Sequence, residues 1–442
     1  MTRDEPDRPA AVTGPTPPKQ AGDIRDRWEW VEQSVWTERM LTRLEGSEPT
    51  TVWFGLWDKV IAPRNLQAAF WSVWRKEGAP GVDGQTVKQF EAQETAQLAR
   101  LREELHAKRY RRQPARRVWI PKPGTTEQRP LGIPAVRDRT VEAALKHVLE
   151  PIFERDFADH SYGFRPGRGC REAVAQVEAL LNQGRTWCVD LDFKSYFDSI
   201  PHERLMVLVK QRVVDGSVLA LLDQCLQAGV LEELKGWQPT QRGTPQGSVI
   251  SPLLANLYLN PLDHQAVRQG WAMVRYADDL VVLCRTQAEA QGVLSSLRQW
   301  AEEAGLTLHP TKTRIVNAQS EGFDFLGWHF CEGQKWLRKK SLQKLRDKLR
   351  PLTRRTHGQS LDAIIARVNP ILRGWHGYFR DSHPTGLSGP DGWLRRRLRA
   401  LLRKRQKRPG YGRSQADSRQ WPNRWFAAQG LFSLEHGSCT YG

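Results

Sequence analysis

Cysteines and long hydrophobic runs are both scarce in this sequence. The six cysteines are scattered, at positions 170, 188, 225, 284, 331 and 439, and no two have the spacing of a metal-ligand pair. We therefore expect reduced, mostly structural thiols in a cytoplasmic protein, without a disulfide framework. The uncharged stretch Gly247 to Leu262 contains serine, proline and two asparagines, so it is a poor membrane span. The charged, proline-rich N-terminus is also unlike a signal peptide.

Acidic residues are outnumbered, since 67 lysines and arginines face 49 aspartates and glutamates and give a net charge of +18. Such a charge predicts a polyanionic partner, although a generic basic surface is the alternative. The cations are clustered: seven of the thirteen residues from Arg338 to Arg350 are basic, as are nine of the fourteen from Arg395 to Arg408. Leucines at helical spacing run through both clusters and predict helices with a basic face, which favours a phosphate backbone as neighbour.

Two adjacent carboxylates stand between two apolar runs. Tyr276-Ala277-Asp278-Asp279 separates Met273-Val274 from Leu280–Cys284, and this pattern predicts a tight β-hairpin with the acids at its tip. An acidic hairpin tip can hold Mg²⁺ over a reacting phosphate. An ordinary surface turn is the alternative, because aspartate is a common turn residue.

A second acidic segment supplies the partner carboxylate that such a metal site needs. In Trp187–Phe193 apolar residues alternate with Cys188, Asp190 and Asp192, which predicts a strand with both aspartates on one face. A solvated face is the alternative for this segment taken alone. Two such acidic sites in one basic protein favour metal binding, because two-metal phosphoryl transfer uses acids from separate chain segments.

Further blocks stand in a fixed order over roughly residues 60–435. They are Arg129–Pro134, Ser161–Arg168, Asp192–Phe197, Arg242–Ser248, Tyr276–Asp279, Gly322–Gly327 and Leu372–Trp375. Taken in this order, the blocks resemble those of the bacterial group II intron reverse transcriptases and maturases. The first two resemble finger blocks, the next three resemble polymerase motifs A, B and C, and the last two resemble the end of the palm and the maturase thumb.

The resemblance implies an α+β fold of the right-hand polymerase type, with fingers, a palm with an antiparallel sheet and a helical thumb. We expect a disordered tail over residues 1–22, which contains five prolines, and an N-terminal extension with fingers over 23–185. The palm with the catalytic aspartates is expected over 186–335 and the helical thumb, the maturase domain X, over 336–408. Residues 409–442 would form a C-terminal nucleic-acid-binding tail.

Locally, apolar spacing predicts helices over 25–44, 66–74 and 140–153. A finger hairpin is expected to flank the Lys-Pro-Gly loop at 122–124.

Residue roles follow from the resemblance. Asp192, Asp278 and Asp279 would be catalytic and would hold two Mg²⁺ ions, with Asp190 as a possible auxiliary acid. The residues expected at the nucleotide are Lys122, Arg129, Phe197, Gln246 and Lys312. The two finger cations would clamp the triphosphate. The Phe197 ring would exclude a 2′-hydroxyl, and a core aromatic is its alternative.

Gln246, beside Gly247, would contact the nucleotide or template. Lys312 would lie near the leaving pyrophosphate as a proton donor, with a surface lysine as the alternative. The residues expected to bind nucleic acid are Arg338, Lys339, Lys340, Arg395, Arg396, Arg403, Lys404 and Arg405.

The implied activity is RNA-directed DNA polymerisation, a nucleotidyltransferase reaction on dNTPs with template RNA and a DNA primer or target DNA. The family also binds its group II intron RNA and promotes splicing and retroelement mobility. Three alternatives stay open: a free-standing group II-like enzyme in host defence or repair, a splicing-only RNA-binding maturase, and an RNA-templated RNA polymerase. Because no Cys-x-x-Cys pair follows Trp425–Leu434, we expect no endonuclease module and priming by another route, for example from a nascent strand.

Overall fold

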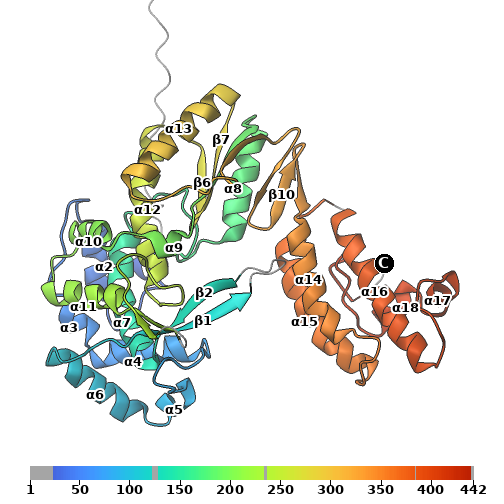
Figure 1. The fold of residues 1–442 in the computed structure, drawn as a ribbon, viewed down its shortest axis with the longest axis horizontal. Coiled ribbons are helices and arrows are strands. Elements are labelled where there is room, and N and C mark those ends of the chain that lie inside the picture. The colour runs from blue at the N-terminus through green and yellow to red at the C-terminus, as the bar shows by residue number, and fades with distance from the viewer. Residues whose placement is uncertain (1–22, 122–127, 233–235, 384, 440–442) are drawn as a thin grey trace, which may run out of the picture. The chain divides into compact units, whose positions relative to one another are not determined.

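The computed structural model describes residues 23–121, 128–232, 236–383 and 385–439. The predicted tail at 1–22 and Lys122 lie outside these residues. The chain forms two compact units: unit 1 comprises residues 1–121, 127–180 and 189–315, and unit 2 comprises 122–126, 181–188 and 316–442. Both units contain helices and strands, so the predicted α+β class is confirmed (Figure 1).

The helices of the chain up to residue 303 are α1 (Ile24–Arg27), α2 (Glu38–Glu45), α3 (Trp57–Val60), α4 (Pro63–Trp74), α5 (Val87–Glu91), α6 (Glu94–His106), α7 (Val136–Glu154), α8 (Cys170–Asn182), α9 (Tyr196–Ser199), α10 (His202–Lys210), α11 (Gly216–Gln227), α12 (Ser251–Arg268) and α13 (Gln287–Glu303). The helices after residue 303 are α14 (Lys339–Leu352), α15 (Leu361–Phe379), α16 (Thr385–Arg405), α17 (Gln415–Gln420) and α18 (Asn423–Ala428).

The strands form three sheets. One has the order β2 (Gln128–Ile133), β1 (Ala115–Pro121), β4 (Val230–Glu232) and β5 (Gly236–Gln238). Another has the order β6 (Met273–Tyr276), β7 (Asp279–Cys284), β3 (Trp187–Asp192) and β8 (Arg314–Asn317). The third has the order β11 (Gln334–Leu337), β10 (Trp328–Cys331) and β9 (Phe323–Phe325).

Helix α7 forms the centre of the unit 1 core. It is buried around most of its circumference, with Val141, Leu145 and Val148 fully buried, as expected of a helix surrounded by protein. α4 packs along it and presents Leu66, Phe70 and other apolar residues. The predicted helices at 66–74 and 140–153 are confirmed within α4 and α7.

The antiparallel pairs are also as predicted. β1 and β2 pair antiparallel from Arg116↔Ile133 to Pro121↔Gln128, which confirms the finger hairpin. β6 and β7 pair antiparallel, and the predicted strand at Trp187–Phe193 is β3. α13 packs against β7, so the β6–β7 hairpin is supported by a helix that follows it in the chain.

The predicted helix over residues 25–44 is wrong. Only its two ends are helical, as α1 and α2, and residues between them form turns. Two indoles explain the difference: Trp28 Nε1 donates to Glu45, and Trp36 Nε1 donates to the carbonyl of His147 on α7. These tertiary bonds and the burial of both rings outweigh the local helical spacing.

Unit 2 joins a three-stranded antiparallel sheet to helices. The hydroxyl of Ser341 on α14 donates to the carbonyl of Gly327, and the hydroxyl of Tyr378 on α15 donates to that of Leu326. α14 packs on α15 and α16, and the basic helices predicted at 338–350 and 395–408 are found there. No helix in the described part of the chain is long and apolar enough to cross a membrane.

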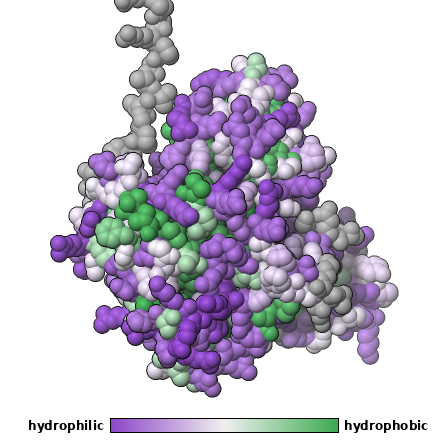
Figure 2. Space-filling model, turned by 60° about the vertical axis from the view of Figure 1, so that its left-hand side comes forward, coloured by the Kyte–Doolittle hydropathy of each residue, from purple (hydrophilic) through white to green (hydrophobic). Residues whose placement is uncertain are grey.

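Unit 1 exposes several large apolar side chains. They include Val52, Phe54, Val207 and Val214. A β-bridge between Trp53 and Val213 brings Val52 and Phe54 beside Val214. Figure 2 shows an apolar area on a surface that is otherwise mostly hydrophilic.

Candidate active site

The two acids of the β6–β7 hairpin stand at a turn of two residues. Tyr276 pairs with Asp279 across the hairpin, so Ala277 and Asp278 form the loop, as the sequence predicts. Ala277 has φ +58°, a left-handed conformation that hairpin turns require and that glycine usually supplies. An alanine in this conformation costs about 1–2 kcal/mol, so the surrounding structure must hold the turn.

Arg275 holds that turn from beneath. Its guanidinium is fully buried, and Nη1 donates to the Ala277 carbonyl at 2.9 Å and to Asn256 Oδ1 at 3.0 Å. Nε donates to Asp263 Oδ1 at 2.8 Å, and Nη2 contacts the other oxygen. Burial, the largest single influence, would raise the pKa of Asp263, but the charge and hydrogen bond of Arg275 together with those of His160 lower it. A buried, fully paired guanidinium therefore fixes the hairpin tip to α12.

The finger block Ser161–Arg168 lies against the same hairpin. Ser161 bridges to Arg275 in parallel, and Tyr162 N donates to the Arg275 carbonyl at 2.8 Å. Asn256 Nδ2 donates to the Gly163 carbonyl at 2.7 Å. A Cβ on Gly163 would lie 2.3 Å from Ala277 N, so glycine is needed for this close backbone approach.

The structure brings Asp192 and Asp278 together. Asp192 ends β3, and Asp278 lies just before β7, its neighbour in the sheet. Burial raises the pKa of Asp278, and the negative charge of Asp192 raises it further, whereas Arg275 and Lys312 oppose this. Lys312 Nζ lies 2.5 Å from Asp192 Oδ2. Asp279 opens β7 and is half-buried, and Asp190 lies beside Arg314, at 3.4 Å.

This donor set fits Mg²⁺. Two carboxylates that repel each other are stabilised by a cation between them, and the Lys312 ammonium already takes that place at Asp192. In the described parts of the chain no three His, Cys, Asp or Glu side chains gather closely enough to hold a metal alone. Mg²⁺ commonly binds through one or two carboxylates plus substrate phosphates, so a substrate would complete the coordination.

Phe197 follows the Asp192 carboxylate by five positions in the chain. It belongs to α9, which begins after Ser195 at φ +50°, and its ring is half-buried. Its centroid lies 5.6 Å from that of Tyr196 and 6.5 Å from that of Phe164. The Phe197 carbonyl accepts a 2.7 Å hydrogen bond from Thr244 N, which ties it to the block at Arg242–Ser248.

Gln246 lies against the finger hairpin. Its carbonyl accepts from Gly132 N on β2 at 2.7 Å, and a Cβ on Gly247, at φ +112°, would lie 2.2 Å from the Gly132 carbonyl oxygen. On the same strand, the Arg129 side chain is exposed and makes no hydrogen bond or ion pair with other described residues. The structure therefore brings the Arg129 and Gln246 blocks together.

A buried acid anchors this loop. Glu142 on α7 accepts hydrogen bonds from Ser248 Oγ at 2.9 Å and Val249 N at 2.7 Å, and it pairs with Arg112 at 2.5 Å. Both side chains of the ion pair are 1% exposed. The position of Gln246 thus depends on a charge pair inside unit 1.

The predicted basic residues of unit 2 divide into two groups. The side chains of Lys339, Lys340 and Lys404 are exposed and make no hydrogen bond or ion pair with other residues that the structure describes. Arg395, in contrast, is 5% exposed and pairs with Asp391 at 3.0 Å, so it has no surface to offer a phosphate. Arg403 pairs with Asp417 at 2.5 Å and is largely buried.

The remaining predicted basic residues of unit 2 are at least partly exposed but also make contacts within the protein. Arg338 pairs with Asp324 at 2.7 Å, and Arg396 is exposed but donates to the Gly392 carbonyl at 3.3 Å. Arg405 is exposed and donates to the carbonyls of His357 and Gln359. Much of the arginine charge of α16 therefore holds the fold of unit 2, and Arg395 is removed from the predicted interface.

The sequence did not indicate the residues that support the site. Arg275 and Asp263 lie twelve positions apart, and Glu142 lies 106 positions from Ser248. The one signal available in the sequence was Arg275, because an arginine in an otherwise apolar strand needs a buried partner.

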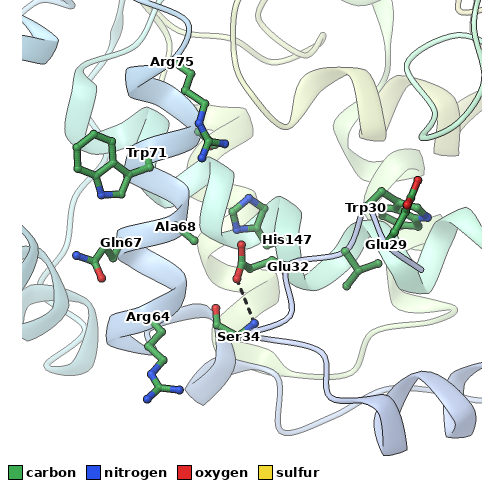
Figure 3. A pocket seen from close by; sticks show the side chains of 12 residues that line it. Glu29, Trp30, Glu32, Ser34, Arg64, Gln67, Ala68, Trp71, Arg75 and His147 are labelled. Atoms are coloured by element: carbon green, nitrogen blue, oxygen red, sulfur yellow. Dashed lines mark hydrogen bonds between the residues drawn. The ribbon is translucent and has the colours of Figure 1, made fainter. Parts of the chain in front are cut away.

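A hollow of about 610 Å³ in unit 1 is lined by none of the predicted site residues. Figure 3 shows its lining: the α4 residues Arg64, Gln67 and Arg75 lie on one side, Trp30 lies on the other, and Glu32, Ser34 and His147 lie between them. Burial lowers the pKa of His147 to about 4, so this imidazole is neutral at physiological pH.

Comparison with known proteins gives two family matches. The family described as "Reverse transcriptase (RNA-dependent DNA polymerase)" matches residues 120–330, and "Group II intron, maturase-specific domain" matches residues 342–421. Among solved structures, telomerase from Candida albicans with a fragment of telomeric RNA has a TM-score of 0.41 at 12% identity, covering 70% of this chain and 60% of that chain. A partial Cas6-RT-Cas1–Cas2 complex has a TM-score of 0.35 at 23% identity, with 56% and 41% covered.

Protein YkfC of Escherichia coli (strain K12) is 37% identical over 287 residues, which covers 56% of this chain and 74% of YkfC. Group II intron-encoded protein LtrA of Lactococcus lactis subsp. cremoris is 35% identical over 212 residues, covering 47% of this chain and 34% of LtrA. The match to an uncharacterized 91 kDa protein in a cob intron of Schizosaccharomyces pombe, at 29% identity, covers 62% of this chain and 44% of that protein. The chain thus spans most of YkfC but less than half of the other two. It belongs to the reverse transcriptases that carry a group II intron maturase domain.

Proposed function

We propose that the protein is an RNA-directed DNA polymerase of the group II intron type, which acts by two-metal nucleotidyl transfer and also binds intron RNA to promote splicing and mobility. One observation carries the polymerase half of the proposal. Asp192 at the end of β3 lies close enough to Asp278, just before the neighbouring strand β7, for its charge to raise the pKa of Asp278, and Lys312 pairs with Asp192. Paired acids on a rigid sheet are what phosphoryl transfer requires, because its catalysis consists mainly of positioning and charge neutralisation.

In this proposal Asp192, Asp278 and Asp279 hold two Mg²⁺ ions. When bound, the ions would neutralise the triphosphate and lower the pKa of the primer 3′-hydroxyl. Lys312 is held by Asp192 at the site, from which its ammonium can bind the leaving pyrophosphate and give it a proton. The guanidinium of Arg129, exposed and unpaired among the described residues, is available to bind the triphosphate in bidentate fashion.

Sugar selection would rest on Phe197. Its half-buried ring has Tyr196 and Phe164 as neighbours. Its backbone carbonyl accepts a hydrogen bond from Thr244 N. A ring fixed in this way rejects a 2′-hydroxyl by steric conflict and so selects dNTPs. Gln246, set against β2 by the Gly132 bond, would contact the nucleotide or the template base.

The RNA-binding half rests on unit 2. The exposed side chains of four lysines on α14 make no hydrogen bond or ion pair with other described residues: Lys339, Lys340, Lys344 and Lys348. Lysines without partners on one helix can neutralise phosphates and release counterions. The match to the maturase-specific domain over 342–421 includes most of this helix.

Primer extension by Asp278→Asn tests the assignment. The assay uses the full chain, a DNA primer on an RNA template, dNTPs and Mg²⁺, with a gel shift on group II intron RNA run on the same preparation. We expect extension to be lost and RNA binding to be kept, because affinity comes from phosphate contacts and not from the carboxylates. Asp58→Asn, which removes an exposed carboxylate elsewhere in unit 1, should leave both unchanged. Full extension by Asp278→Asn would refute the site.

A further inference from the structure

Phe164 combines two features that a folded protein rarely puts on one residue. Its side chain is 50% exposed, although it is a large apolar ring. Its backbone has φ +58°, a left-handed conformation that a bulky residue rarely adopts. Glycine would suit this backbone better, and a buried position would suit this ring better, so neither burial nor local conformation explains the phenylalanine.

The residues on both sides hold Phe164 in this conformation. Gly163 is pressed against the backbone of Ala277, and its carbonyl accepts a hydrogen bond from Asn256. Arg165 is buried, pairs with Glu154 and donates to the carbonyls of Ala158 and Ser161 at 2.6 and 2.8 Å. Strain that is held in place by surrounding structure is typical of functional sites.

The ring of Phe164 stands between two parts of the active site. Its centroid lies 6.5 Å from that of Phe197, with the two planes at 85°, and 6.2 Å from that of Tyr276. Phe197 is the proposed sugar-selecting residue, and Tyr276 precedes the catalytic turn. The edge-to-face packing limits where the Phe197 ring can move, while half of the Phe164 surface stays open to a ligand.

We propose that Phe164 is a second specificity-determining residue, which contacts the sugar of the incoming deoxynucleotide and keeps Phe197 in the position that excludes a 2′-hydroxyl. The proposal deepens the polymerase function proposed above and rests on it. Without the Phe164 ring, Phe197 could turn aside, and a ribose would fit. Selection against ribonucleotides would then require both rings.

Phe164→Gly separates this role from a role in folding, because glycine removes the ring and fits the left-handed backbone without strain. Single-nucleotide addition by the full chain on a primed RNA template gives kcat/KM for a dNTP and for the matching rNTP. We expect the dNTP preference of Phe164→Gly to fall about tenfold, the size expected from one pocket contact, with the melting temperature unchanged. Phe164→Tyr, which keeps the ring, should keep the preference. Phe197→Ala serves as the positive control.

The outcomes are distinguishable. If the wild-type chain does not extend the primer, the polymerase function fails and this proposal fails with it. If the wild type extends and discriminates, and Phe197→Ala loses the preference while Phe164→Gly keeps it within twofold, only the role of Phe164 is refuted. A Phe164→Gly chain that does not fold would also refute it, since the ring would then serve the fold.

Discussion

At the scale of single residues, Gly163 shows how little space separates the finger block from the catalytic turn. A methyl group there would lie 2.3 Å from Ala277 N, and the neighbour is backbone that cannot rotate away. We predict that Gly163→Ala moves the turn and lowers kcat about 100-fold, the loss expected from a misplacement of about 1 Å. Primer extension at saturating dNTP measures this.

Gly169→Ala is the matched control, because its new methyl would meet only the carboxylate end of Glu172, at 3.1 Å. A flexible side chain can move by a few tenths of an ångström, so we expect activity within twofold of wild type. Equal losses in both variants would show that the close contact at Gly163 does not govern the turn.

At the scale of elements, α7 carries a histidine whose charge would oppose folding. Burial lowers the pKa of His147 to about 4; Glu32 raises it slightly, while Lys146 and Lys76 lower it. In the unfolded chain the pKa is near 6.5, so between these values the unfolded state binds more protons. The stability this group contributes is complete above about pH 6.5 and is lost as the pH falls toward 4, by up to about 3 kcal/mol.

We therefore predict that His147→Gln loses less thermal stability between pH 7 and pH 5 than wild type does. The buried Asp138, with its pKa raised to about 6 by burial, acts in the opposite direction over this range but is present in both proteins and cancels. His106→Gln, at an exposed site on α6, should behave as wild type. An identical pH dependence in His147→Gln and wild type would contradict the prediction.

A second prediction at this scale concerns how an arginine of α16 stabilises the fold. Arg403 pairs with the buried Asp417 of α17, whereas its neighbour Lys404 is exposed. Arg403→Gln should lower the free energy of unfolding by about 1–3 kcal/mol, because it leaves a buried carboxylate with fewer partners. Lys404→Gln removes the same charge and should leave stability unchanged. Chemical denaturation of both variants measures the difference, and equal stabilities would show that the pair is not structural.

At the scale of the whole molecule, the net charge of +18 does not reveal which cations bind RNA. We predict that replacing Lys339, Lys340 and Lys344 with glutamine weakens RNA binding and reduces the salt slope of log K by about 2, since each phosphate contact contributes about 0.7–0.9. Replacing Lys88, Lys108 and Lys210, exposed lysines of unit 1, removes the same charge elsewhere. An equal change in slope for both triple variants would assign the effect to total charge and not to α14.

Local patterns predicted the parts of the fold that are built from neighbouring residues. The β6–β7 turn, the alternation in β3 and the finger hairpin all follow from spacings of a few residues. The helix predicted over 25–44 does not form, because Trp36 bonds to a residue more than a hundred positions away. The same limit applies to the site: Asp278 could be found from its motif, but the buried partners of Arg275 and the Glu142 anchor depend on contacts that only the folded chain makes. Charge composition also misled, because it cannot separate Arg395, which is buried, from Lys339, which is exposed.

The Arg275 network has a consequence for how this region opens. The amide of Tyr162 is bonded to the Arg275 carbonyl, and that of Arg275 to the His160 carbonyl, while the Arg275 side chain holds both α12 and the turn. Releasing either segment alone would leave the buried guanidinium with some of its N–H groups unpaired, which is costly. The finger block, the hairpin and α12 should therefore open as one cooperative unit, and the amide hydrogens of Tyr162 and Arg275 should exchange with solvent at the same free energy of opening.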